Sequence, residues 1–389
     1  MITKMQVERF RAINDATVRL GPFNVLIGRN DSGKTSFLEA VYALSNSTRN
    51  PIAESFWSPW RGKNLIHNGQ GDSVRFTADL SDEKKRASAI QYSVSVRTGG
   101  DSCVVEQEAY DGTVLLADLR ETLICRQVRG NAIDPSIAPR LEQVKSGLLP
   151  AALTRWDLEE LGAISMLPPD RNQPFDPTGY GLGTCLAELK LYNDHAFDAI
   201  SRGFCELFTE FKGIGFRRVQ SQYWRRDQYK RRTFGSTGDC FEMILFREDG
   251  VEVPGSLASG GTLVTLAFLT IAELGGGLLL VEEPENGLHP GRLKEVVEML
   301  RRICETRPGS QVVLTTHSPF LLDYAEPHEV RLFFRDEQSN VRVHHLEDTP
   351  DIKDRLKYIM LGELVFNEWD TFVEEIRQHA DSGPGRGTE

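Results

Sequence analysis

Residues 23–37 read FNVLIGRNDSGKTSF, and this stretch decides the fold. Residues 23–27 form a short apolar run, which is typical of a buried strand. From Phe37 onward, apolar residues repeat at helical spacing, at Ala40, Val41 and Leu44. Residues 28–35 between them match the phosphate-binding pattern G-x-x-x-x-G-K-S/T in full. A strand, a glycine-rich loop and a helix in this order predict a nucleotide-phosphate site on an α/β fold.

The spacing assigns roles within this loop. Gly28 and Gly33 let backbone N–H groups turn inward around phosphate oxygens. Lys34 is expected to reach the β- and γ-phosphates, and the Thr35 hydroxyl to ligate Mg²⁺. The other expected nucleotide-binding residues of the loop are Asn30, Asp31, Ser32 and Ser36. The alternative, an accidental glycine-rich turn, is disfavoured by the strand and helix on either side.

Two carboxylates follow a second apolar run. Glu282 and Glu283 come directly after residues 278–281, LLLV. Ligands of parallel sheets bind at the carboxyl ends of the strands. One carboxylate can therefore hold Mg²⁺ while its neighbour orients an attacking water. The alternative is a solvated acidic turn before a helix.

Two further features carry less information when taken alone. Ser259, Gly260 and Gly261 open a predicted helix at 263–273, and they would supply either backbone donors or a simple helix cap. His317 ends the predicted strand at 311–316, where a structural histidine is the usual finding. The strands at 278–282 and 311–316, with the helix between them, predict a parallel βαβ unit.

The order of these features resembles the ABC-type P-loop ATPases of the SMC, RecF and OLD-nuclease group. The matching segments are GRNDSGKTS at 28–36, LASGGT at 257–262, LLLVEEPENGLHP at 278–290 and TTHSP at 315–319. They correspond to the Walker A loop, the signature, Walker B with the D-loop, and the switch histidine. The opening MQVERFRAI resembles the family's first strand and places Arg11 near the nucleotide.

The resemblance implies a catalytic division of labour. Glu283 would polarise the hydrolytic water, His317 would sense the γ-phosphate, and Glu282 would take the metal side. Ser259, Gly260 and Gly261 would bind ATP held by a partner protomer, so that ATP joins two heads in a homodimer. This chain departs from the usual pattern at Glu282, where many relatives have Asp, and in a signature that reads ASGGT instead of LSGGQ.

The implied fold class is an α/β ABC-type ATPase head with an antiparallel β subdomain and a helical insertion. The predicted organisation is an N-terminal ATPase lobe at 1–71, an antiparallel β subdomain at 72–117, a mostly helical insertion ending in a basic segment at 118–235, a C-terminal ATPase lobe at 236–345, a helical segment at 346–380 and a disordered tail at 381–389.

Composition indicates a globular protein of the reducing cytoplasm. The 389 residues are 40% hydrophobic and carry a net charge of −11, which argues against coating nucleic acid through bulk charge. Six cysteines without a C-x-x-C pair argue against disulfides or a zinc site. No signal peptide or membrane segment is expected. The apolar stretch at 262–281 is split by glycines into a predicted core helix and a buried strand.

One segment is strongly basic, although the chain as a whole is acidic. Residues 212–232 contain eight basic residues and one acidic residue, with aromatic residues interleaved. This pattern is expected where phosphates are gripped or bases stack, so DNA is a possible partner. A solvated loop, or a patch that docks an acidic protein, is an equal alternative.

The spacing of the motifs indicates which branch of the family this chain resembles. Only 224 positions separate Thr35 from Ser259, too few for long coiled-coil arms, and 72 residues follow His317, too few for a fused nuclease. The first hypothesis is a Mg²⁺-dependent ATPase that controls DNA engagement or a separately encoded effector nuclease or toxin, in DNA repair or anti-phage defence. The second is a nucleotide-gated scaffold that holds an effector inactive with little turnover. A transporter motor is disfavoured by the large insertion.

Overall fold

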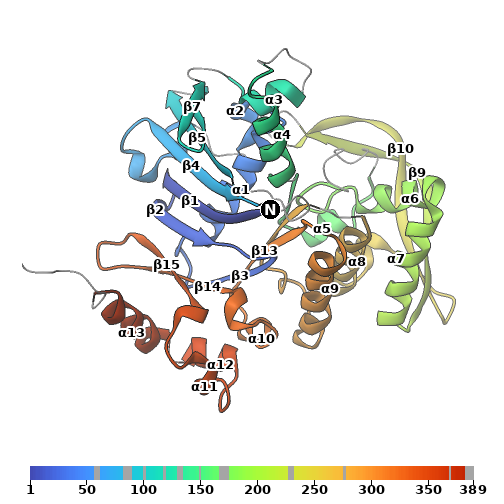
Figure 1. Cartoon of the computed structure of the whole chain (residues 1–389). Coiled ribbons are helices and arrows are strands. Elements are labelled where there is room, and N and C mark those ends of the chain that lie inside the picture. The colour runs from blue at the N-terminus through green and yellow to red at the C-terminus, as the bar shows by residue number, and fades with distance from the viewer. Residues whose placement is uncertain are drawn as a thin grey trace, which may run out of the picture.

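The computed structural model describes residues 1–56, 62–81, 90–99, 102–116, 120–128, 135–148, 150–165, 175–226, 232–274, 277–367 and 369–381. These ranges contain two six-stranded sheets and one three-stranded sheet (Figure 1). Residues 382–389 of the predicted tail lie outside them.

The first sheet is antiparallel and has the order β2-β1-β4-β5-β6-β7. Its strands are β1 (Ile2–Phe10), β2 (Ile13–Arg19), β4 (Ser73–Leu80), β5 (Ile90–Gly99), β6 (Ser102–Tyr110) and β7 (Thr113–Leu116). The turn between β6 and β7 is formed by Asp111 and Gly112, both at positive φ, as a tight hairpin requires. The predicted boundary between residues 71 and 72 needs correction, because β1 and β2 belong to the same sheet as β4–β7.

The second sheet is central and has the order β15-β14-β3-β13-β12-β8. Its strands are β3 (Phe23–Ile27), β8 (Ala151–Thr154), β12 (Leu278–Glu282), β13 (Gln311–Thr316), β14 (Val330–Arg335) and β15 (Val341–His345). All neighbouring pairs are parallel except β14 with β15. This confirms the predicted βαβ unit and the α/β fold.

The central sheet is buried on both faces, which explains its continuous apolar strands. Alternate residues face two different cores. Leu26, Leu280 and Val313 pack with helix α1 (Lys34–Asn46), which lies between the two six-stranded sheets (Figure 1). Val25, Val281 and Leu314 face the opposite core, formed with α8 (Gly260–Leu274) and α9 (Leu293–Thr306).

The remaining helices connect or cover these sheets. They are α2 (Ile52–Ser55), α3 (Leu123–Val128), α4 (Ala138–Gly147), α5 (Leu158–Leu161), α6 (Leu182–Tyr192), α7 (Asp194–Leu207), α10 (Pro319–Leu322), α11 (Ile352–Arg355), α12 (Leu361–Asn367) and α13 (Trp369–Asp381). Among the described residues, no helix is both long and apolar enough to cross a bilayer.

The prediction of a mostly helical segment over 118–235 is wrong at its end. Apart from residues 227–231, which lie outside the described ranges, the basic segment belongs to a long two-stranded ribbon of β9 (Phe211–Arg226) and β10 (Arg232–Arg247), extended by β11 (Glu252–Pro254). Helix α7 ends at Leu207, and Phe208 and Phe211 after it pack in the same core as Phe204 of this helix. The ribbon forms here because buried Ile214, paired with Leu245, packs its base into the core beneath α6 and α7.

Candidate functional site

The loop between β3 and α1 is shaped by two glycines. A Cβ atom on Gly28 would lie 2.1 Å from the Phe333 carbonyl oxygen, so only glycine fits at the end of β3. Gly33 has a φ of 100°, a conformation that side chains disfavour, and it leads directly into α1 at Lys34. The loop therefore presents its backbone at a helix N-terminus, which favours anions.

Lys34 is buried against this loop. Its Nζ atom donates hydrogen bonds to the carbonyl oxygens of Gly28, at 2.8 Å, and Arg29, at 3.1 Å. Burial lowers the pKa of Lys34 to about 8, against the opposing pull of the Glu283 and Glu282 carboxylates. The amine is thus charged at neutral pH and lies at the phosphate loop.

Thr35 and Glu282 meet across the end of the sheet. The Thr35 hydroxyl donates to Oε1 of Glu282 at 2.5 Å, although 247 positions separate the two residues. A hydroxyl and a carboxylate are hard oxygen ligands, the set that Mg²⁺ prefers. Their convergence beside the phosphate loop fits the metal site predicted from the sequence.

Glu283 and His317 form a second pair. His317 Nε2 lies 3.4 Å from Oε1 of Glu283, while Asn286 donates to Oε2 at 2.8 Å. Glu283 has a φ of 47°, an unusual conformation for a glutamate that turns it off the end of β12. Burial and the nearby Lys34 charge lower the pKa of His317, so its ring is neutral at neutral pH. A carboxylate held between an amide and a neutral imidazole suits water activation.

A cavity of about 710 Å³ opens above the loop. Its lining includes the predicted residues Arg11, Asn30, Asp31, Ser32, Gly33, Lys34, Thr35, Ser36, Glu283 and His317. Glu282 lines a smaller adjoining cavity of about 330 Å³, together with Glu283. Both volumes are in the range of small-molecule sites, and the larger one is wide enough for a nucleotide.

The signature residues lie apart from this cavity. Ser259, Gly260 and Gly261 are not among its lining residues. The Ser259 Oγ atom accepts from the Thr262 N–H at 3.2 Å, which caps the start of α8. A Cβ atom on Gly261 would lie 3.2 Å from the Gly287 carbonyl oxygen, so the signature packs closely on the predicted D-loop.

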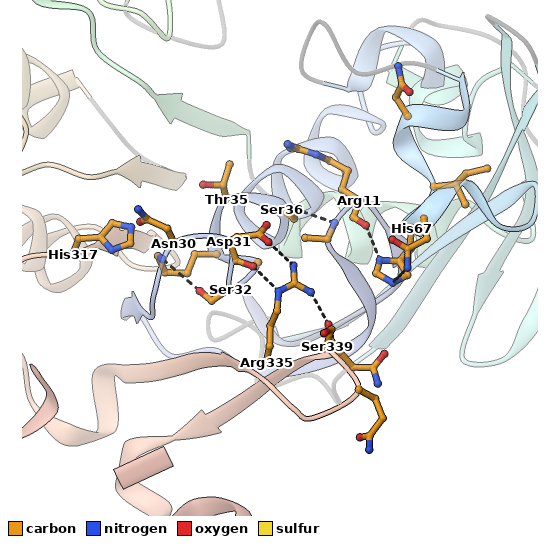
Figure 2. A pocket seen from close by; sticks show the side chains of 18 of the residues that line it. Arg11, Asn30, Asp31, Ser32, Thr35, Ser36, His67, His317, Arg335 and Ser339 are labelled. Carbon is orange, nitrogen blue, oxygen red and sulfur yellow. Dashed lines mark hydrogen bonds and ion pairs between the residues drawn. The ribbon is translucent and has the colours of Figure 1, made fainter. Parts of the chain in front are cut away.

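The hairpin between β14 and β15 also lines the cavity, although sequence analysis missed it. Arg335 donates to the Asp31 carbonyl oxygen at 2.9 Å and to that of Ser339 at 2.6 Å, and Figure 2 shows its guanidinium between them. On the other side, His67 contacts the Arg11 carbonyl oxygen at 2.7 Å through Nδ1 (Figure 2). The segment RDEQSN at 335–340, polar between two strands, was the available signal.

Two more charged residues, which were not predicted, lie behind the predicted metal site. Arg155, directly after β8, is ion-paired with Glu282 and, at 2.6 Å, with Glu39. Glu39 is buried in α1 and is also ion-paired with Arg11. Burial and the neighbouring Arg155 charge lower the pKa of Arg11 to about 10. The sequence signal for Arg155 was its position directly after a short apolar run.

Comparison with solved structures identifies the fold. A structure titled as the Smc head bound to the C-winged helix domain of ScpA matches at a TM-score of 0.56 and 15% identity, covering 88% of this chain and 97% of the other. An Smc head from Pyrococcus furiosus matches at 0.55 and 12%, covering 92% and 99%. At these identities the likeness establishes the fold alone, that of an Smc head domain.

Sequence comparisons point to the same group. Family models match residues 1–97, described as "AAA ATPase domain", and residues 193–323, described as "AAA domain, putative AbiEii toxin, Type IV TA system". DNA replication and repair protein RecF from Enterobacter sp. (strain 638) and from Cronobacter sakazakii is 48% identical over 46 residues. Those residues are 12% of this chain and 13% of each RecF. The chain is thus similar to AAA-type ATPase domains and to RecF over parts of its length, and it has the fold of an Smc head.

Proposed function

We propose that this protein is a Mg²⁺-dependent ATPase whose heads pair when ATP is bound. One observation carries the proposal. Residues 34, 35, 282, 283 and 317 come from three parallel strands and their following loops, and they converge at one edge of the central sheet. Phosphate binding, metal binding and water activation need these side chains in one place.

Each of these side chains has a task in hydrolysis. The charged Lys34 would move from the loop carbonyl oxygens to the phosphates. Glu283, held by Asn286, would orient the attacking water and accept its proton. The neutral His317 would donate to the γ-phosphate from beside Glu283. Thr35 and Glu282 would hold Mg²⁺, which neutralises charge on the phosphates when it is bound.

The place of the signature supports pairing of two heads. Ser259, Gly260 and Gly261 lie at the N-terminus of α8, outside the nucleotide cavity of their own chain. Backbone donors at such a position favour a phosphate. A second protomer would supply that phosphate, so that each ATP is held between two chains.

Light scattering tests the pairing. With ATP and Mg²⁺, Glu283→Gln should run as a dimer because it binds ATP without hydrolysing it. Ser259→Arg in the same background should remain a monomer, since its bulk blocks the facing nucleotide. Lys34→Ala is the matched control for nucleotide dependence. A Glu283→Gln protein that binds ATP and stays monomeric contradicts the shared site.

DNA is the partner that we propose for the ribbon. Arg225, Arg226 and Arg232 stand near its tip, and the register pairs Arg226 with Arg232. Arginines at the ends of both strands, within a segment of net positive charge, favour an anionic partner. RecF, by name a replication and repair protein, matches one short segment. Charge reversal at Arg225 and Arg226 should abolish retention of duplex DNA, whereas reversal at exposed Arg97 should not.

A separately encoded effector in the cytoplasm, a nuclease or toxin, is the second partner that we propose. The support is the family model for residues 193–323, whose description names a toxin system. ATP-dependent pairing of the heads would then control the effector, in DNA repair or anti-phage defence. Co-expression with the product of the neighbouring gene tests this: a complex that Lys34→Ala changes supports control by nucleotide, and a complex indifferent to it contradicts that control.

One observation favours the second hypothesis, a nucleotide-gated scaffold with little turnover. The Glu282 carboxylate is already ion-paired with Arg155, so its negative charge is partly neutralised before any metal binds. Tight ATP binding with no measurable hydrolysis, and an effector released only when ATP binds, would establish this function in place of the ATPase.

A further inference from the structure

We propose that Arg155 is a positioning residue for Glu282, and that its charge limits how tightly the Thr35–Glu282 site binds a divalent cation. This inference rests on the proposed function of that site. Strand β8 runs parallel to β12, with Thr154 opposite Val281. Arg155 and Glu282 are therefore the next residues on neighbouring strands, and their side chains meet at the end of the sheet.

Both oxygens of Glu282 are engaged. Oε1 accepts from the Thr35 hydroxyl at 2.5 Å, and Oε2 accepts from Nε of Arg155. A carboxylate held at both oxygens has one orientation. The oxygen that faces Thr35 is the one a shared metal would use, so the contact from Arg155 sets the geometry of the pair.

The guanidinium has a second contact that fixes it in place. Its NH2 group donates to Oε1 of Glu39 at 2.6 Å. Glu39 is 2% exposed, and Arg11 pairs with its other oxygen. Two arginines and two glutamates thus alternate in a partly buried chain of balanced charge, with Glu39 as its fully buried member. Removing one member leaves a buried charge uncompensated, which is costly.

The backbone at Arg155 is also held in place. Its N–H donates to the Pro177 carbonyl oxygen at 2.7 Å. The next residue, Trp156, packs edge-on against Phe268 of α8, with ring centroids 4.3 Å apart. These contacts fix the backbone from which the Arg155 side chain reaches Glu282 and Glu39.

A fixed positive charge beside a metal-holding carboxylate has a predictable effect. It repels a divalent cation and competes for one carboxylate oxygen. Loss of the charge should raise affinity for the cation, about tenfold or more, because a charge within one side-chain length of a partly buried site acts at low dielectric. The same loss should free the orientation of Glu282 and lower turnover.

Manganese binding to the full chain, measured by electron paramagnetic resonance without nucleotide, tests the charge. Arg155→Gln should bind Mn²⁺ about tenfold more tightly than the unaltered protein. Arg155→Lys keeps the charge with only one nitrogen, so its Mn²⁺ affinity should stay near the unaltered value. Arg155→Gln combined with Glu39→Gln restores the charge balance and should return part of the affinity change. Arg97→Gln, which removes an arginine from an exposed pair with Glu106, should change nothing.

Measurement of ATP turnover separates the effect of Glu282 orientation from the effect of the Arg155 charge. Arg155→Lys should hydrolyse ATP more slowly despite normal Mn²⁺ affinity, because a lysine cannot bridge Glu282 and Glu39 together. Unchanged Mn²⁺ affinity in a folded Arg155→Gln protein, or the same affinity gain in Arg155→Lys, would overturn the role of Arg155 alone. An unaltered protein that binds no ATP in the presence of Mn²⁺ would overturn the proposed function, and this inference with it.

Discussion

Raising the pH from 7 to 9 should weaken ATP binding about tenfold, because it removes the proton from Lys34. Burial lowers the pKa of this amine to about 8. The charged form therefore predominates below pH 8 and is lost as the pH rises through that value. About nine-tenths of the protein is charged at pH 7 and about one-tenth at pH 9. If only the charged amine pairs with phosphate, the binding free energy falls by about 1.4 kcal/mol.

A fluorescent ATP analogue, titrated at constant ionic strength and fixed Mg²⁺, measures this effect. Lys34→Met is the matched control, and its weaker affinity should be the same at both pH values. His317 does not interfere, because its pKa is lowered and its ring stays neutral across this range. Equal affinity of the unaltered protein at pH 7 and pH 9, or an equal slope in Lys34→Met, would refute the assignment of Lys34 to the phosphates.

Three substitutions extend the test. Gly28→Ala places a Cβ 2.1 Å from the Phe333 carbonyl oxygen, so it should cost roughly 1–3 kcal/mol of stability and weaken ATP binding; chemical denaturation measures the first, and full stability would contradict the close packing. Glu39→Ala leaves Arg11 and Arg155 without their shared buried partner, so it should lower the free energy of unfolding by about 3–5 kcal/mol. A loss under about 1 kcal/mol would show that the ion pairs contribute little. Ser259→Ala should leave ATP binding by the isolated head unchanged and weaken dimer formation, whereas weaker binding by the monomer would place Ser259 in its own chain's site.

The nucleotide loop was predictable because its signals are local. Residues 23–27 are apolar, the glycines are spaced for the loop, and the helix repeats at 37, 40, 41 and 44. The structure has β3 at Phe23–Ile27, as predicted, and the predicted helix is α1, which begins at Lys34, ahead of the apolar repeat that starts at Phe37. The meeting of Thr35 with Glu282 was also predictable, since the carboxyl ends of parallel strands share one edge.

The residues behind the site were not predictable, because their environment is set by distant strands. Glu39 sits among apolar residues of α1 and reads as an ordinary polar position, yet it is buried by Arg11 and Arg155 from two other strands. The ribbon was missed for a related reason. The many charged residues at 211–226 obscure the alternation of apolar and polar residues that is typical of a strand. Burial of Ile214 against the helices nevertheless makes this segment a strand.

The most direct test of the central claim is ATP hydrolysis by the purified protein, with and without duplex DNA. We expect Mg²⁺-dependent turnover that both Lys34→Ala and Glu283→Gln abolish, with ATP binding lost in the first and kept in the second. Arg97→Gln should hydrolyse ATP at the unaltered rate. Stimulation by DNA would support a role for the ribbon. Undiminished hydrolysis in Glu283→Gln would contradict the assignment of water activation to the residue that follows β12.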